Sequence, residues 1–155
     1  MIVGVAKETY PGECRVALVP SIVPQLTKAG VEIVIETGAG QTAGFEDLAY
    51  QEKGARIVPS RAEAFAGDVV LQVRSFGANP TVGQSDLQYM HEGMVMVGMC
   101  DPLGNPSAIR EIAKRHAAML SLELIPRITR AQSMDVLSSM ATIAGYRAVL
   151  LAATR

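Results

Sequence analysis

The sequence has no tryptophan, only two cysteines and two histidines, and aromatic residues fill 5% of its 155 positions. Such a scarcity of rings argues against surfaces that stack bases. Cys14 and Cys100 show neither a disulfide framework nor metal-ligand spacing, which favours a reducing compartment and predicts no metal site. We expect Cys14 to be a plain thiol and Cys100 a small core residue. His91 and His116 have no recognisable catalytic partner, so we expect both on the solvated surface.

Strong charge of either sign is also missing. Fourteen Lys and Arg face 15 Asp and Glu, a net charge of −1. With no basic stripe, nucleic acid is not an expected partner. The start, "MIVGVAKETYPGE", lacks the basic and apolar regions of a signal peptide. No apolar stretch reaches about 18 residues without a charge, so direct membrane insertion is not expected.

What is abundant is apolar: 49% of the residues, arranged as short β-branched runs that alternate with helical patterns. This alternation predicts an α/β fold with a doubly wound, mostly parallel sheet of flavodoxin-like or Rossmann-like type, ending in a long helix. Strands are expected at 2–6, 31–37, 55–58, 68–74, 93–99 and 119–125. Helices are expected at 21–30, 45–54, from 60, at 106–117 and after 128, with a turn or short helix at 85–93.

Capping residues predict where several helices start and stop. Ser21 and Asn105 are expected as N-caps, and Gly30 as a stop signal. The capping-box spacing also occurs at Ser60 with Glu63 and at Ser85 with Gln88. Segment 75–84, "SFGANPTVGQ", is rich in glycine and proline and is expected to be a surface loop, although it follows a strand end where ligands bind in such folds.

The segment "GAGQTAG" matches a dinucleotide-binding pattern, G-x-G-x-x-A, at Gly38, Gly40 and Ala43. No clean helix starts at the second glycine, and acidic residues on both sides of the loop would repel a pyrophosphate. We therefore favour a tight turn that seats Phe45.

Two cations are expected at the carboxyl edge of the sheet, Lys7 and Arg15. Either they hold a carboxylate or phosphate ligand, or they pair with Glu8 or Glu13. The sequence leaves these alternatives open.

The segment "IPRITRAQSMDVLSSMATIAGY", residues 125–146, crowds polar groups around the expected start of the last helix. Thr129 and Gln132 have capping-box spacing, and Asp135 suits the positive end of the helix dipole. Arg127 and Arg130 are electrostatically unfavourable there unless an anion binds, so the residues favour a ligand site. Small residues follow that let a flat ligand or another backbone approach closely: Ser138, Ser139, Ala141, Ala144 and Gly145.

Three segments resemble the N-terminal part of the alanine dehydrogenase/nicotinamide nucleotide transhydrogenase family: "KETYPGECRVALVP", "ETGAGQTAGFEDLAYQEKGARIV" and "IPRITRAQSMDVLSSMATIAGYRAV". The last looks like the NAD(H)-binding component of the transhydrogenases. The resemblance implies hydride transfer between NAD(H) and NADP(H), coupled to proton translocation. It further implies that NADP(H) is bound by a partner component, and that a membrane component keeps the complex at the cytoplasmic side of the inner membrane. A homodimer through the C-terminal helix region is also expected.

The same resemblance implies the site residues. Arg127, Gln132 and Asp135 are expected to be catalytic, by orienting the nicotinamide rather than by acid–base chemistry. The cofactor-binding set is expected to be larger and comprises Arg127, Ile128, Thr129, Gln132, Ser133, Met134, Asp135 and Ser138.

Two departures from the family matter. Alanine dehydrogenases resemble the chain at Arg15 but carry Lys where we align Arg74 and His where we align Asp101, which leaves amine oxidation without an obvious proton acceptor. Residues 1–155 also correspond to the N-terminal subdomain alone: the Rossmann subdomain expected after residue 155 and a returning C-terminal segment are absent. We expect the isolated chain to bind NAD weakly and to be inactive. An alanine dehydrogenase-like subdomain and a non-catalytic assembly or dimerisation module remain the alternatives.

Overall fold

The computed structural model describes residues 1–154. The chain forms two compact units, Met1–Ser121 and Leu122–Arg155. The first unit contains the sheet and its flanking helices, and the second contains the segment singled out above as a ligand site.

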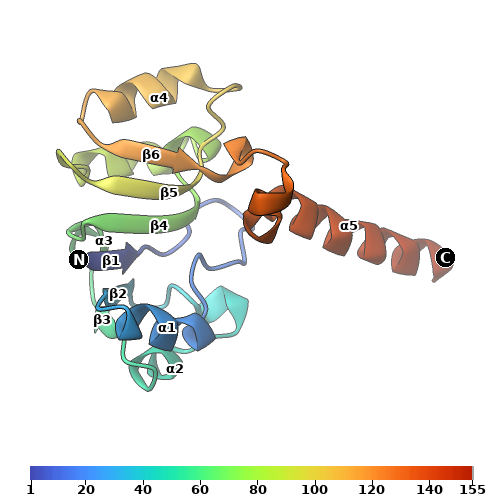
Figure 1. The fold of residues 1–155 in the computed structure, drawn as a ribbon, viewed down its shortest axis with the longest axis horizontal. Helices are drawn as coiled ribbons and strands as arrows, with labels where there is room; N and C mark the ends of the chain where they lie inside the picture. The colour runs from blue at the N-terminus through green and yellow to red at the C-terminus, as the bar shows by residue number, and fades with distance from the viewer. Residues whose placement is uncertain (155) are drawn as a thin grey trace. The chain divides into compact units, whose positions relative to one another are not determined.

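The first unit is built on a six-stranded sheet in the order β3-β2-β1-β4-β5-β6 (Figure 1). Its strands are β1 (Ile2–Val5), β2 (Glu32–Glu36), β3 (Arg56–Val58), β4 (Val69–Arg74), β5 (Val95–Met99) and β6 (Ala118–Ser121). Every pairing is parallel, and Val3 of β1 lies between Ile33 of β2 and Val69 of β4. The doubly wound sheet is therefore confirmed. Its strand order reverses between β1 and β4, the place where ligands bind in open α/β sheets.

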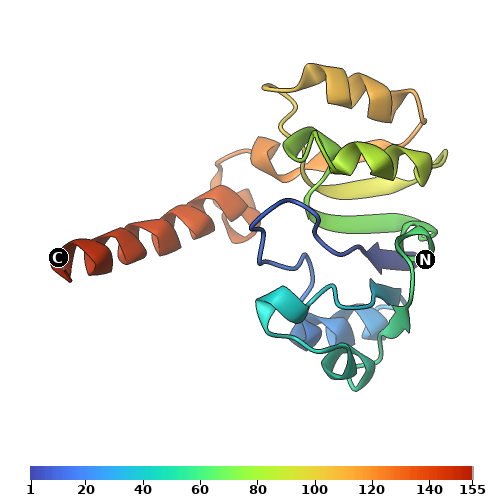
Figure 2. The same cartoon turned by 180° about the vertical axis from the view of Figure 1, so that it is seen from behind.

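Short helices cover the sheet (Figures 1 and 2). They are α1 (Val23–Lys28), α2 (Asp47–Gln51), α3 (Arg61–Phe65) and α4 (Pro106–Ala113), with 3-10 helices η1 (Pro20–Ile22), η2 (Gln41–Ala43), η3 (Phe76–Ala78) and η4 (Gly83–Gln88). Neighbouring residues of β4 face different cores, because side chains alternate along a strand. Val69 packs against the cluster that includes Val23 and Tyr50, whereas Val70 belongs to the cluster that includes Phe65 and Ile112.

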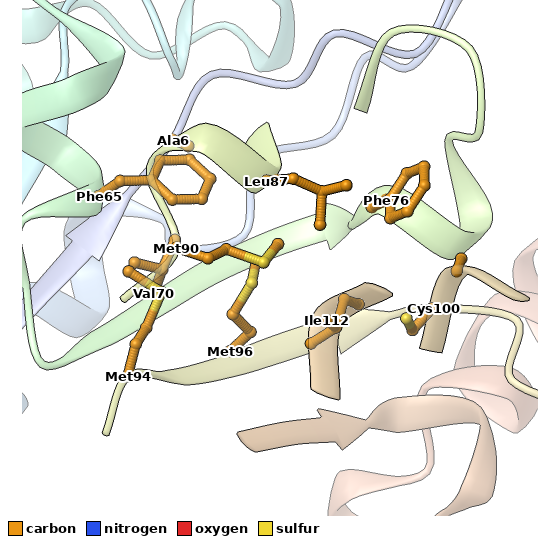
Figure 3. Packing of buried hydrophobic residues seen from close by; sticks show 11 residues of the cluster. Ala6, Phe65, Val70, Phe76, Leu87, Met90, Met94, Met96, Cys100 and Ile112 are labelled. Atoms are coloured by element: carbon orange, nitrogen blue, oxygen red, sulfur yellow. The ribbon is translucent and has the colours of Figure 1, made fainter. Parts of the chain in front are cut away.

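The second of these clusters is rich in methionine and holds Met90, Met94 and Met96 (Figure 3). Met94 and Met96 are fully buried, as is Cys100. The prediction that Cys100 is a small core residue is thus confirmed. On this face of the sheet α3, η4 and α4 contribute Phe65, Leu87 and Ile112 to the cluster.

Three of the predicted helix signals are confirmed. The Ser60 hydroxyl accepts a hydrogen bond from the Glu63 backbone N–H (3.3 Å), and the Asn105 side chain accepts one from the Ala108 N–H (3.4 Å). Gly30 follows α1 with a φ of 80°, a left-handed conformation that glycine adopts without strain.

Two predicted caps are wrong. Ser21 lies inside η1, and α1 starts after Ile22 with no side-chain cap, because Pro20 starts a 3-10 turn earlier in the chain. Ser85 lies inside η4, where its hydroxyl donates to the Val82 carbonyl (2.8 Å) instead of capping a helix with Gln88.

The expected surface loop at 75–84 is also wrong, since Phe76, Gly77 and Asn79 are buried. The 3-10 helices η3 and η4 satisfy the backbone of this segment, and Phe76 packs into the methionine-rich core. The strand predicted at 119–125 ends at Ser121, where the first unit ends too.

Gly4 of β1 is expected to be intolerant of a side chain. A Cβ atom there would collide with the Ala64 carbonyl of α3, so we expect Gly4→Ala to lower the unfolding free energy by about 1 to 3 kcal/mol in urea denaturation. Gly145→Ala is the matched control, because nothing lies within 4 Å of its added Cβ and alanine favours a helix. Equal tolerance at both positions would contradict this packing.

The second unit comprises η5 (Leu122–Leu124), η6 (Thr129–Met134) and the long helix α5 (Val136–Ala153). The predicted terminal helix is therefore present. No residue of α5 is buried, although the helix is apolar apart from Arg147 and a few hydroxyl groups. By length and composition, α5 is also the one helix of residues 1–154 that could cross a bilayer.

Candidate functional site

The junction between η6 and α5 differs from the predicted continuous helix. Residues Thr129–Met134 form a 3-10 helix, and the extended backbone of Asp135 (φ −77°, ψ 91°) separates it from α5. Ile128 occupies the N-cap position of η6, and no side chain caps that helix. The capping box predicted from Thr129 and Gln132 is therefore wrong.

Asp135 is the residue that caps α5. Its Oδ1 accepts a hydrogen bond from the Ser138 N–H (3.0 Å), and its Oδ2 accepts one from the Ser138 hydroxyl (2.6 Å). These two bonds, first that of the hydroxyl, hold the pKa of Asp135 below its ordinary value, and the charge of Arg127 lowers it further. Asp135 is a carboxylate fixed in place at the start of α5.

The other predicted site residues are exposed. Arg127, Gln132 and Ser133 are exposed, as are Thr129 and Ser138. Ile128 and Met134, with exposed fractions of 55% and 56%, are apolar side chains on this surface. All eight predicted residues fall within the second unit, between the residues before η6 and the first turn of α5. The junction thus offers an amide, a guanidinium and a fixed carboxylate, which together can hold a planar polar group such as a carboxamide.

The glycine-rich loop after β2 does not fit a phosphate group. Asp47 places its own carboxylate there, accepting hydrogen bonds from the Gly38 N–H (2.9 Å) and the Thr37 hydroxyl (2.6 Å). Phe45 packs edge-on against the buried Tyr50 ring, 6.4 Å between centroids. The predicted tight turn that seats Phe45 is confirmed.

At the carboxyl edge of the sheet, Arg15 pairs within the chain. Its Nε and one terminal nitrogen contact the two carboxylate oxygens of Glu13 at 2.7 and 2.6 Å, and Arg74 adds a third contact at 3.0 Å. Of the two alternatives for Arg15, a bound anionic ligand or a pair with a nearby glutamate, the structure contains the pair with Glu13. Lys7 differs, since no carboxylate of residues 1–154 lies within ion-pair distance of its ammonium group.

Sequence reasoning missed a buried ionic network beside the switch point. Arg61, at the start of α3, makes a bidentate pair with Asp86 of η4 (2.6 and 2.7 Å) and also donates to the Lys7 carbonyl (2.7 Å) and Glu36 (3.2 Å). Gln72 donates to Asp86 as well (3.3 Å), while its own Oε1 has no partner among the described residues. The partners lie 25 or more positions apart in most cases, so no local motif points to them.

The Glu13 pair predicts a specific loss of stability in acid. Bonds from Arg15 lower the pKa of Glu13 to about 2 from an ordinary 4.5. Because the folded-state pKa is depressed, the stabilisation is complete above about pH 5 and is lost as pH falls toward 2, on the order of 2 to 3 kcal/mol. Urea denaturation across this range should show a smaller pH dependence for Glu13→Gln than for wild type. Identical pH profiles for the two proteins would contradict the assignment.

The sequence of the chain is similar to those of known proteins. The family model described as "Alanine dehydrogenase/PNT, N-terminal domain" matches residues 4–144. The chain is 40% identical to the NAD(P) transhydrogenase subunit alpha of Cereibacter sphaeroides over 151 residues, which is 97% of this chain and 28% of the relative.

Solved structures show the same likeness. The crystal structure of transhydrogenase from Sinorhizobium meliloti is 41% identical, with a TM-score of 0.90, and the match covers 99% of this chain and 44% of that one. An L-alanine dehydrogenase is more distant, 29% identical with a TM-score of 0.74 over 81% of this chain and 33% of that chain. The chain thus spans less than half the length of these relatives, and it belongs to the alanine dehydrogenase/PNT family, within its N-terminal domain.

Proposed function

We propose that residues 1–155 are the N-terminal subdomain of the NAD(H)-binding component of a proton-translocating NAD(P) transhydrogenase. In this proposal the η6–α5 junction is the nicotinamide-side loop of the NAD(H) cleft. The observation that carries the proposal is the exposed Gln132 side chain, which caps no helix, three positions before Asp135, whose carboxylate is fixed by Ser138. The relatives of this chain include transhydrogenase alpha subunits. The relatives are longer than this chain, and in this proposal a Rossmann subdomain would hold the rest of the dinucleotide.

The chemistry suits a site without an acid or base. NAD(H), when bound, gives or takes a hydride, and no proton moves to or from the ring. The task of this chain is then to orient the ring toward the NADP(H) held by a partner component, since correct placement supplies much of the rate. Gln132 can donate to and accept from the carboxamide, and Arg127 can reach ribose or phosphate oxygens. Asp135 and Ser138, bonded to each other, keep the start of α5 in place beside them.

Cofactor contacts are proposed for the neighbouring residues as well. Ile128, Thr129, Ser133 and Met134 are exposed around Gln132 and would pack against the nicotinamide and its ribose. The set contains apolar and hydroxyl side chains, which fits a ring with one polar substituent.

The surface of the chain supports partners beyond the cofactor. A helix that is apolar around its circumference is normally covered, and we propose that α5 forms the homodimer contact.

On the sheet, Val97 is only half-buried and Leu120 is 58% exposed, although parallel sheets are covered on both faces. In this proposal the returning segment that the family resemblance implies would cover that face. Membrane contact, in this proposal, comes through partner subunits at the cytoplasmic side of the inner membrane.

The test is a chimera in which this chain replaces the corresponding segment of a full-length relative. We expect the chimera, assembled with its partner components, to transfer hydride from NADPH to an NAD⁺ analogue of shifted absorbance. A chimera that folds, assembles and binds NADH but transfers no hydride would contradict the proposal.

The alanine dehydrogenase alternative makes a different prediction. It requires Arg15 to hold the carboxylate of pyruvate or alanine, but Glu13 already occupies that guanidinium in a bidentate pair. We expect no chemical-shift change at Arg15 in an NMR titration with millimolar pyruvate. Saturable binding of pyruvate there would favour the alternative.

A further inference from the structure

The second unit differs from the first in charge. Residues 1–121 contain 10 Lys and Arg against 13 Asp and Glu, a net charge of −3, whereas residues 122–155 contain four Arg against two acidic residues, a net charge of +2. The second unit has no lysine, and its exposed apolar side chains include Leu124, Ile128 and Met134. Arginine and methionine without lysine, beside exposed apolar groups, form the composition of a protein–protein interface rather than of a free surface.

Arg130 is an exposed cation of this unit without a neighbour of opposite charge. Among residues 1–154, no carboxylate lies within ion-pair distance of its guanidinium group. Arg127 differs, because its charge acts on the carboxylate of Asp135. When a partner covers an unpaired guanidinium, the loss of water is costly unless the partner brings a carboxylate to it. Arg130 therefore favours an acidic group on any surface that covers η6.

The geometry of η6 places Arg130 next to the face that carries Gln132. Three residues make one turn of a 3-10 helix, so residues three apart share a face. Gln132 thus shares its face with Thr129, and Arg130 shares the next face with Ser133. Ala131, which is 5% exposed, marks the face that is turned inward. A nicotinamide held on the Gln132 face leaves the Arg130 face at its border, where a second molecule can reach it.

Hydride transfer identifies that second molecule, and this step rests on the proposed function. The two nicotinamide rings must meet at about 3 to 3.5 Å, so the component that carries NADP(H) has to cover η6. We propose that Arg130 is a docking residue for this component and pairs with a carboxylate on its surface, beside the nicotinamide rather than on it. Ile128 and Met134, 55% and 56% exposed, surround the pair and exclude water from it in the complex.

The experiment measures how the chimera described above binds the separate NADP(H)-binding component. Titration calorimetry gives the Kd between the two components, and stopped-flow absorbance gives the rate of hydride transfer at saturating partner. Arg130→Glu is expected to raise this Kd by about tenfold or more at low salt, because close charge pairs at interfaces couple strongly. The rate at saturation and the Kd for NADH should stay within about twofold of wild type, since the pair acts on association. Added NaCl should raise the Kd between the components more in wild type than in the variant.

Arg115→Glu is the matched control. Arg115 is an exposed arginine of the first unit, so the same charge reversal there should leave the Kd between the components unchanged. A melting curve shows whether each variant folds, and Arg130→Ala, with a smaller expected rise, replaces Arg130→Glu if the latter does not.

Three results would overturn the docking residue. They are an unchanged Kd between the components in a folded Arg130 variant, an equal rise in Arg115→Glu, and weaker NADH binding in Arg130→Glu. The last would mean that Arg130 holds the dinucleotide itself. A wild-type chimera that binds its partner through Arg130 but transfers no hydride would support the docking residue and contradict only the proposed function.

Discussion

Replacing Asp86 by alanine is expected to lower the unfolding free energy by about 3 to 5 kcal/mol, because it leaves Arg61 as a buried cation without its bidentate partner. The side chains of Asp86 and Arg61 are 2% and 14% exposed, and the pair joins η4 to the start of α3. Urea denaturation followed by far-ultraviolet circular dichroism measures the loss. A domain with a total stability of 5 to 15 kcal/mol would be brought close to unfolding.

The matched control is an ion pair on the surface. Arg56 and Glu32 are 2.8 Å apart, but their side chains are 56% and 50% exposed, so Glu32→Ala is expected to cost at most about 1 kcal/mol. Similar losses in the two variants would mean that the buried network does not hold η4 and α3 together.

The second large effect is expected in hydride transfer. In the chimera, Gln132→Ala should lower kcat by about 100-fold, because a ring that is misplaced by about an ångström loses much of its rate. Thermal stability should stay unchanged, since Gln132 is exposed and caps no helix. Stopped-flow absorbance and a melting curve give the two readouts.

Two further variants sharpen this experiment. Gln25→Ala replaces another exposed glutamine, in α1, and should leave both readouts unchanged. Asp135→Asn keeps a residue that caps helices well but removes the charge. If Asp135 only caps α5, the Asp135→Asn chimera should retain full activity. If the charge of Asp135 helps to position the ring, the activity of this variant falls although α5 remains intact. Wild-type rates in Gln132→Ala would contradict the proposed site.

The fold followed from the sequence because its signals are local. Alternation of β-branched runs with helical patterns predicts a parallel doubly wound sheet, and Gly30, Ser60 and Asn105 mark helix ends by their own hydrogen bonds or backbone conformation. The failures have a common cause. Ser21, Ser85 and Thr129 all lie in 3-10 helices, whose tighter turns carry no distinct periodicity in sequence.

The candidate site at residues 127–135 could be proposed from the sequence, whereas the contacts between distant charged residues could not. Arg127, Gln132 and Asp135 lie in one continuous segment, so a motif could point to them. Glu8 and Asp86 act on partners far along the chain, Val73 and Arg61, and their environment exists only after the sheet is assembled. The burial of a charged residue is a tertiary property, and no local sequence pattern indicates it.

The most direct test of the central claim is an NMR titration of the chain with NADH, with and without a supplied Rossmann subdomain, in wild type and in the double variant Gln132→Ala, Asp135→Ala. We expect shift changes at residues 127–138 that appear only with the Rossmann subdomain present and vanish in the double variant. If the subdomain and NADH both bind while these residues never respond, the η6–α5 junction is only the start of a capped helix, and the nicotinamide lies elsewhere.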